Sequence, residues 1–107
     1  TIFVLEPRRS SNEGALIQGG RFQTDLLALE AEVKDERFPD GWAFFSFGNA
    51  RTMKHSAEPV PPTAASPGEM SCVECHTKHT AVERTFVQFY PTLLVVARKM
   101  GTVKPGF

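Results

Sequence analysis

The chain has 107 residues, of which 41% are hydrophobic and 22% charged, and its twelve basic residues balance twelve acidic ones. We expect residues 1–107 to form one small domain with a limited core, to which a cofactor or a partner subunit would add stability. A neutral chain has no electrostatic basis for binding nucleic acid or an anionic membrane, and no apolar run approaches the roughly 20 residues that span a bilayer.

The N-terminal part predicts strands. Residues 2–5 (Ile-Phe-Val-Leu) predict a short buried strand, and residues 10–14 predict a turn. Apolar residues alternate with Ala, Glu and Lys over 27–34, which favours a half-buried antiparallel strand over a helix, the alternative that its good helix formers permit. The sequence opens at Thr1 without a targeting segment, so we expect a processed chain or a fragment.

The middle of the chain predicts an aromatic strand followed by an irregular loop. The turn residues 39–41 (Pro-Asp-Gly) precede residues 42–47, Trp-Ala-Phe-Phe-Ser-Phe, which are apolar on both faces. One face can pack on a sheet while the other lines a pocket or an interface. The proline-rich residues 58–68 predict a loop without regular structure.

The last third of the chain changes to a helical period. Apolar residues spaced by four and three predict an amphipathic helix that Pro91 would bend or interrupt. Gly101 is its predicted end, with Arg98 and Lys99 complementing the helix dipole. The fold class is therefore α+β, a mainly antiparallel sheet followed by a helical segment. The apolar face of this predicted helix consists of Val82, Phe86, Phe89, Leu93, Val96 and Met100.

The two cysteines lie in one motif, C-x-x-C-H, at residues 72–76. The thiols of Cys72 and Cys75, on one helical turn, can add to the two vinyl groups of a heme, and the adjacent imidazole of His76 then faces the iron. A thioredoxin-like pair is disfavoured by that histidine and by the lack of a βαβ pattern. A zinc site that includes His79 would crowd four ligands into eight residues. A buried structural pair remains the third alternative, and covalently attached heme c is favoured.

A sixth iron ligand would decide between electron transfer and ligand binding. Met70 and His79 lie too near the attachment turn to reach the opposite face of the heme. Met100 belongs to the predicted helical core, and we expect His55 at the surface. Met53 is the remaining candidate for the sixth ligand. None of these residues is a persuasive ligand, so the sequence predicts an iron with one open coordination position.

With these features the chain resembles the cytochrome P460 and cytochrome c-prime-beta family. The likeness lies in residues 29–35 with Arg37 and Phe38, in 41–47 and in 72–91, above all in Thr-Phe-Val-Gln-Phe-Tyr-Pro at 85–91. It implies an antiparallel β fold with helices, a homodimer, a periplasmic location after signal-peptide removal, and heme ligated only by the proximal histidine. The family's N-terminal helix and first strand have no counterpart here, so we expect a fragment or a fold that another chain completes.

Members of this family do two different things. Enzymes of the P460 type oxidise hydroxylamine with a heme that is also cross-linked to a lysine, whereas c-prime-beta proteins lack this bond and bind gases such as nitric oxide. The lysine position falls on Leu5 here, and the position of Lys54 does not fit the role. The resemblance therefore implies small-ligand binding, with a hydroxylamine-oxidising enzyme as the alternative and electron transfer to a partner cytochrome as the second.

Aromatic side chains are the candidates for the heme surroundings. A small neutral ligand enters an apolar pocket without the desolvation cost that a charged ligand has. Core packing is the alternative role for every one of them. A base for hydroxylamine oxidation would be Glu58 or Glu69, both expected at the surface. The aromatic candidates are Trp42, Phe44 and Phe45 for the distal wall, and Phe86, Phe89 and Tyr90 for the proximal side.

Overall fold

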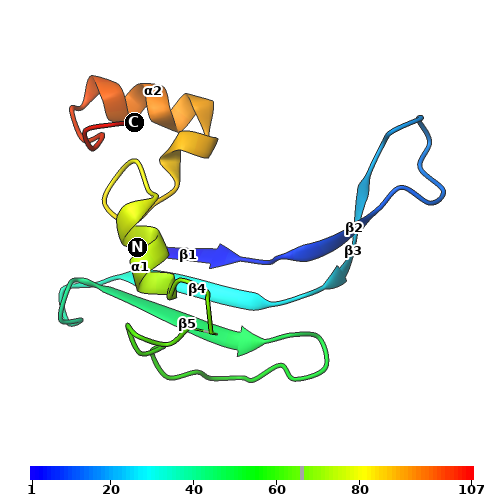
Figure 1. The fold of residues 1–107 in the computed structure, drawn as a ribbon, viewed down its shortest axis with the longest axis horizontal. Helices are drawn as coiled ribbons and strands as arrows, with labels where there is room; N and C mark the ends of the chain where they lie inside the picture. Colours follow the sequence, from blue (N-terminus) through cyan, green and yellow to red (C-terminus); the bar gives the residue numbers. More distant parts are fainter. Residues whose placement is uncertain (66) are drawn as a thin grey trace. The chain divides into compact units, whose positions relative to one another are not determined.

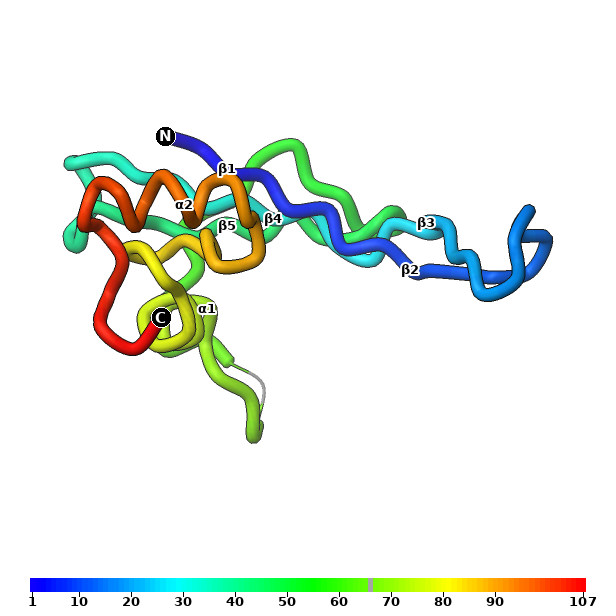
Figure 2. Tube along the Cα trace, turned by 90° about the horizontal axis from the view of Figure 1, so that it is seen from above, coloured from blue at the N-terminus to red at the C-terminus, as the bar shows by residue number. Residues whose placement is uncertain are grey.

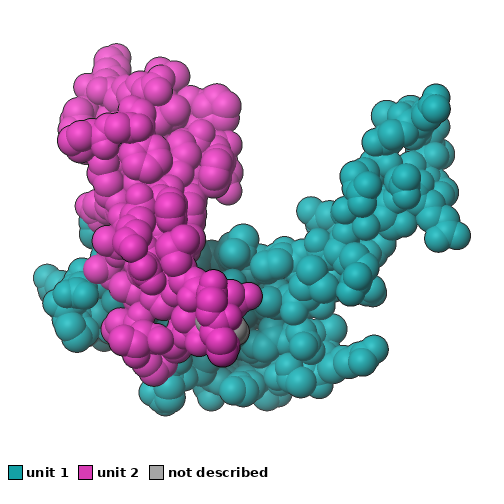
Figure 3. Space-filling model, in the orientation of Figure 1, with its two compact units in different colours: residues 1–60 teal, residues 61–107 magenta. Residues whose placement is uncertain are grey.

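The computed structural model describes residues 1–65 and 67–107, which form two compact units, Thr1–Val60 and Pro61–Phe107 (Figure 3). Among the described residues the strands lie in the first unit and the helices in the second (Figure 1). All strand pairs are antiparallel, so the predicted α+β class is confirmed. The prediction of one domain stays a prediction. The strands are β1 Ile2–Leu5, β2 Arg8–Ser11, β3 Phe22–Leu26, β4 Leu29–Lys34 and β5 Trp42–Gly48.

The first unit is built on a long antiparallel hairpin. β1 pairs with β4, with Leu5 opposite Glu30, and farther along the same two chain segments β2 pairs with β3. Pro7 lies between the two pairings, and because it has no N–H it cannot donate to the ladder. Its carbonyl still accepts from the Leu27 amide at 2.8 Å. Both views show the β2–β3 arm extending beyond the β1–β4 pair (Figure 1 and Figure 2).

The aromatic strand β5 pairs with β4, which makes β4 the central strand in the order β1-β4-β5. The side chain of Phe44 is only 5% exposed, and Ala43 beside it is also buried. The sequence interpretation of residues 27–34 as a strand and not a helix is confirmed, because β4 is a strand at Leu29–Lys34. Its half-buried side chains follow from its central place in the sheet.

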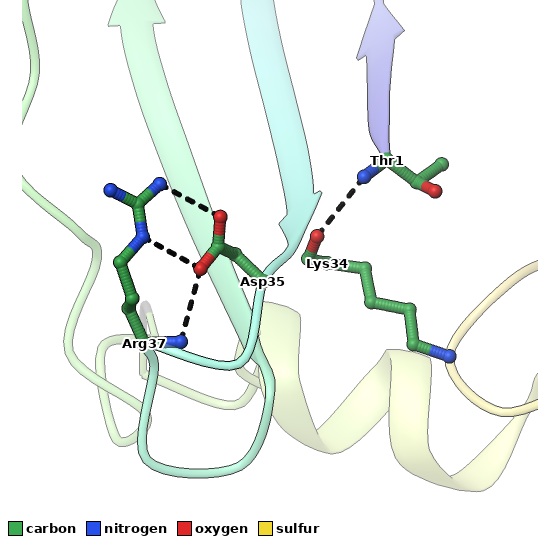
Figure 4. Close-up of polar contacts among 4 residues, drawn as sticks. All are labelled: Thr1, Lys34, Asp35 and Arg37. Atoms are coloured by element: carbon green, nitrogen blue, oxygen red, sulfur yellow. Dashed lines mark hydrogen bonds and ion pairs between the residues drawn. The ribbon is translucent and has the colours of Figure 1, made fainter.

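An ion pair holds the turn between β4 and β5 (Figure 4). The Arg37 guanidinium contacts the Asp35 carboxylate at 2.7 and 2.8 Å, and the Arg37 amide donates to the same group at 3.0 Å. The Arg37 hydrogen bonds hold the pKa of Asp35 well below its usual range. Gly41 has φ +72°, which favours glycine there. Next to this turn the backbone nitrogen of Thr1 donates to the Lys34 carbonyl at 3.1 Å, which extends the β1–β4 ladder.

Two predictions for the first unit are wrong. The strand at residues 2–5 exists as β1, but it is not buried, since its four side chains are between 45% and 68% exposed. The predicted turn at 10–14 begins later, since Ser10 and Ser11 pair with Gln23 and Phe22, and only Glu13 and Gly14 turn. The strand β3, which supplies that pairing, was not predicted. Short polar residues favour turns locally, and here a long-range strand partner overrides that preference.

The second unit contains α1 Cys72–Lys78, the 3-10 helix η1 Val87–Phe89, and α2 Pro91–Lys99. The predicted helix over 82–100 is wrong before Pro91, which begins α2 instead of interrupting a longer helix. Proline forces the preceding residue out of the helical region, and Tyr90 has extended angles, φ −120° and ψ 92°. No helix in the described residues has the length and apolar character that crossing a membrane requires.

The C-terminal end of α2 confirms the predicted stop. Gly101 has φ +68°, its amide donates to the Arg98 carbonyl at 3.1 Å, and the Thr102 amide donates to the Ala97 carbonyl at 3.0 Å. These two bonds form a Schellman motif, which satisfies carbonyls that the helix leaves open. Met100 was predicted to be core but is 71% exposed, and Leu93 and Val96 of the same predicted apolar face are also more than half exposed.

The loop at residues 58–68 has no helix or strand in its described part, as predicted, and Ser66 lies outside the described residues.

Replacing Asp35 by Asn should lower the thermal unfolding midpoint at neutral pH, because the variant loses the charge that pairs with Arg37. The folded pKa of Asp35 is lowered, so its stabilisation is present above about pH 4, its unfolded pKa, and is lost as pH falls toward the folded value. Circular dichroism melts at pH 7 and in acid should show the variant and the wild type converging in acid. The matched control is Glu36→Gln in the same turn, and an Asp35 variant that melts like it at pH 7 would contradict the prediction.

Candidate functional site

The motif residues lie on α1, a helix of seven residues that is stabilised at both ends. Ser71 is the N-cap, and its buried hydroxyl accepts from the Glu74 amide at 3.1 Å. Glu74 in the first turn pairs with Lys78 in the last, with 2.6 Å between carboxylate and ammonium. The hydrogen bond from Lys78 lowers the pKa of Glu74, and both charges complement the helix dipole. These contacts make a short helix possible directly after the loop.

The helix brings the three chemical groups of the motif to one face. Cys72 and Cys75 are one turn apart, and His76 lies four positions after Cys72, so the three residues are neighbours on the helix surface. Cys72 is exposed and Cys75 half-buried, and both carry thiols. The predicted helical turn for this motif is present in the structure. A pair of accessible thiols at this spacing can react with two sites on one planar molecule.

The ring of His76 is held by a backbone carbonyl. Nδ1 lies 2.8 Å from the Arg84 carbonyl oxygen, and because a carbonyl only accepts, Nδ1 carries the proton and donates. In the neutral ring Nε2 is then the nitrogen with the lone pair, which is the form that binds a metal. The ring also packs edge-on against Phe86, with centroids 4.8 Å apart, and Phe86 stacks on Phe89 at 5.6 Å. Hydrogen bond and aromatic contact together define the ring's orientation.

A tight turn presents the Arg84 carbonyl. Val82 and Thr85 form an isolated antiparallel bridge, and the Thr85 hydroxyl also donates to the Val82 carbonyl at 2.8 Å. Gln88 fastens the start of this turn, since its amide oxygen accepts from the Ala81 amide at 2.9 Å and its amide nitrogen donates to the His79 carbonyl at 2.6 Å. Neither Gln88 nor Arg84 was singled out from the sequence. A carbonyl acceptor has no residue signature, so no sequence signal could have identified Arg84.

The proposed zinc alternative has no support in this geometry. In residues 1–65 and 67–107 no group of three or more His, Cys, Asp or Glu side chains is arranged to hold a metal ion. A structural zinc site requires four such ligands in a tetrahedron.

The aromatic candidates divide between the two units. Phe44 is buried in the sheet, Phe45 packs edge-on against Phe38 at 6.2 Å, and the Lys34 ammonium lies 5.7 Å from the Trp42 ring centre. These contacts are packing within the first unit, and a distal role for β5 stays a prediction. In the second unit the structure places Phe86 beside the His76 ring and Phe89 in a stack on Phe86, while Phe89 and Tyr90 are exposed.

The remaining candidates all lie at the surface. The predicted exposure of His55 is confirmed, as is that of the two glutamates considered as bases, Glu58 and Glu69. The three methionines are exposed, and His79 after α1 is exposed as well. Leu5 ends β1 opposite Glu30, and Lys54 is exposed with its amide donating to the Phe47 carbonyl. The methionines are Met53, Met70 and Met100.

The chain matches a known protein family. A family model described as Cytochrome P460 matches residues 1–87, which is most of the 107-residue chain. The matched region contains β1 to β5, helix α1 with its motif, and Phe86. A comparison with curated proteins gives no significant match.

Replacing Ser71 by Ala should lower the free energy of unfolding by about 1 kcal/mol, because the Glu74 amide loses its cap. Chemical denaturation followed by circular dichroism measures this. Ser71→Thr should retain most of the stability, since its hydroxyl can cap the helix in the same way. Ser56→Ala, at an exposed loop serine, is the control and should leave the stability unchanged. Equal unfolding curves for the Ser71 and Ser56 alanine variants would refute the role of the cap.

Proposed function

The chain belongs to the cytochrome P460 family and is thus a heme protein, and we propose that its heme is attached covalently through Cys72 and Cys75, with His76 as axial iron ligand. One observation carries this proposal. The motif lies on one face of α1, and the proton of His76 is directed to the Arg84 carbonyl, which makes Nε2 the metal-binding nitrogen.

The residues present fit the group chemically. Each thiol can add its S–H across one vinyl group, so two thioether bonds form and no atom is lost. The exposure of Cys72 and the half-buried position of Cys75 are compatible with reaction on a rigid planar partner. When bound, the heme supplies an iron coordination position and one-electron chemistry. The protein's part is to hold the imidazole in one tautomer and one orientation.

We propose that this iron has one open position and binds small neutral ligands such as nitric oxide. Electron-transfer cytochromes occupy the second axial position with a Met or His side chain, and two of the candidates here, Met70 and His79, lie too near the attachment turn to reach the opposite face of the heme. The family resemblance would put the cross-linking lysine of the enzymes at Leu5, whose hydrocarbon side chain cannot form that bond. Ligand binding is therefore favoured over hydroxylamine oxidation.

The proposal extends to compartment and assembly. Covalent attachment requires reduced thiols and is normally completed after export, which supports a periplasmic location. A homodimer is supported by the family likeness and by the exposed apolar side chains of β1, whose coverage by a second chain would be favourable. These exposed side chains are Ile2, Phe3, Val4 and Leu5.

Intact mass spectrometry under denaturing conditions tests the attachment. The mature protein should exceed its chain mass by one heme, and the variant in which both Cys72 and Cys75 are Ala should lose that increment, because no thioether bond can form. Each single variant should retain at most one bond and release more heme on denaturation than the wild type. A wild-type protein with the bare chain mass after expression with heme-attachment machinery would refute the proposal.

Absorption spectra and turnover test the open iron position. The ferrous protein should be high-spin without added ligand, its Soret band should lie at an ordinary wavelength, and nitric oxide should shift it. Hydroxylamine oxidation with an electron acceptor should not exceed that of free heme. A low-spin six-coordinate ferrous spectrum would refute the open position, whereas a strongly red-shifted Soret band with turnover would identify an enzyme of the P460 type.

A further inference from the structure

The most deeply buried large side chain in the described residues is polar. Thr80, two residues after α1, is 0% exposed, and no apolar side chain of larger volume is buried to this degree in residues 1–65 and 67–107. Removing a hydroxyl from water is costly unless its hydrogen bonds are replaced. The buried Thr80 hydroxyl therefore needs hydrogen-bond partners within the protein.

The Thr80 hydroxyl connects two backbone carbonyls. It donates to the carbonyl of His76 in a short hydrogen bond and to the carbonyl of Glu83 at 2.8 Å. A hydroxyl has one hydrogen, so the two acceptors share it in a three-centre arrangement. One acceptor belongs to the residue proposed to ligate iron. The other directly precedes Arg84, whose carbonyl receives the His76 ring proton. Thr80 thus ties together the two ends of that ring hydrogen bond.

Lys104 supports this hydroxyl from the C-terminal segment of the same unit. Its ammonium donates to the Thr80 hydroxyl oxygen at 2.9 Å and to the Thr77 carbonyl at 3.1 Å, and its amide donates to the Ala81 carbonyl at 2.8 Å. Donation from a cation polarises the hydroxyl and strengthens the bonds that it donates in turn. Burial lowers the pKa of the Lys104 ammonium, which agrees with its place against this segment.

The turn that Thr80 holds is strained. Glu83 has φ +47°, in the left-handed region that residues other than glycine rarely adopt. A turn of this kind persists only where surrounding contacts hold it. The bond from Thr80 to the Glu83 carbonyl is such a contact, and it acts one residue before the carbonyl that orients the imidazole.

We propose that Thr80 and Lys104 are positioning residues that hold the Arg84 carbonyl against Nδ1 of His76 and so set how strongly Nε2 binds the heme iron. This inference rests on the proposed function, in which His76 is the axial ligand. A hydrogen bond accepted from Nδ1–H makes the imidazole a stronger donor to iron, and a stronger donor favours the ferric state. Loosening the carbonyl should therefore weaken the iron–histidine bond.

Resonance Raman spectroscopy of the ferrous holoprotein measures the iron–histidine stretching frequency directly. Thr80→Val removes the hydroxyl at similar volume and should lower this frequency and raise the reduction midpoint potential. Thr80→Ser keeps the hydroxyl and should restore both values toward the wild type. Lys104→Met should also lower the frequency, by a smaller amount than Thr80→Val. The reduction midpoint potential of the Lys104→Met variant is not diagnostic, because the loss of a positive charge by itself lowers this potential.

Matched controls separate positioning from general effects of each substitution. Thr92→Val and Lys99→Met change exposed residues on α2 and should leave the frequency at the wild-type value. Wild-type frequencies in heme-loaded Thr80→Val and Lys104→Met would overturn the proposal. Failure of both variants to fold would assign the network to stability alone and would also overturn it. Absence of an iron–histidine band in the five-coordinate wild type would instead refute His76 ligation, and with it the proposed function.

Discussion

The hydrogen bond from the His76 ring to the Arg84 carbonyl is the contact on which the candidate site depends. It joins residues eight positions apart, so the chain must turn back within that span to make it. That requirement accounts for the unusual features of the segment, namely the positive φ of Glu83 and the bridge between Val82 and Thr85. Because of this hydrogen bond the imidazole has one tautomer and one orientation, which is what a metal ligand needs.

The elements around this bond are too short to be stable alone. Isolated helices below about 12 residues are marginal in water, and α1 has seven. Its stability therefore comes from the Ser71 cap, the Glu74–Lys78 pair and the returning C-terminal segment with Lys104. A covalent heme would add two further bonds to this helix. The cofactor and the fold of the second unit would then support each other, as the small core of a chain this size requires.

Function within the family depends on different parts of the chain. The motif on α1 supports heme attachment and is common to both activities that the resemblance implies. Leu5 on β1 falls where the resemblance would put the cross-linking lysine, and its hydrocarbon side chain is the reason why ligand binding is proposed instead of the enzymatic activity. In the proposal, this position on a strand decides between the two activities, while the residues proposed to hold the heme are the same for both.

The sequence by itself determined the features that depend on local chemistry. The motif at residues 72–76, the alternation in β4, and the glycine that ends α2 each have a residue signature. Tertiary structure alone decided the rest. It paired Ser10 and Ser11 into a strand and placed a backbone carbonyl on His76. Every residue has the same carbonyl, so only the folded chain determines which one the imidazole meets.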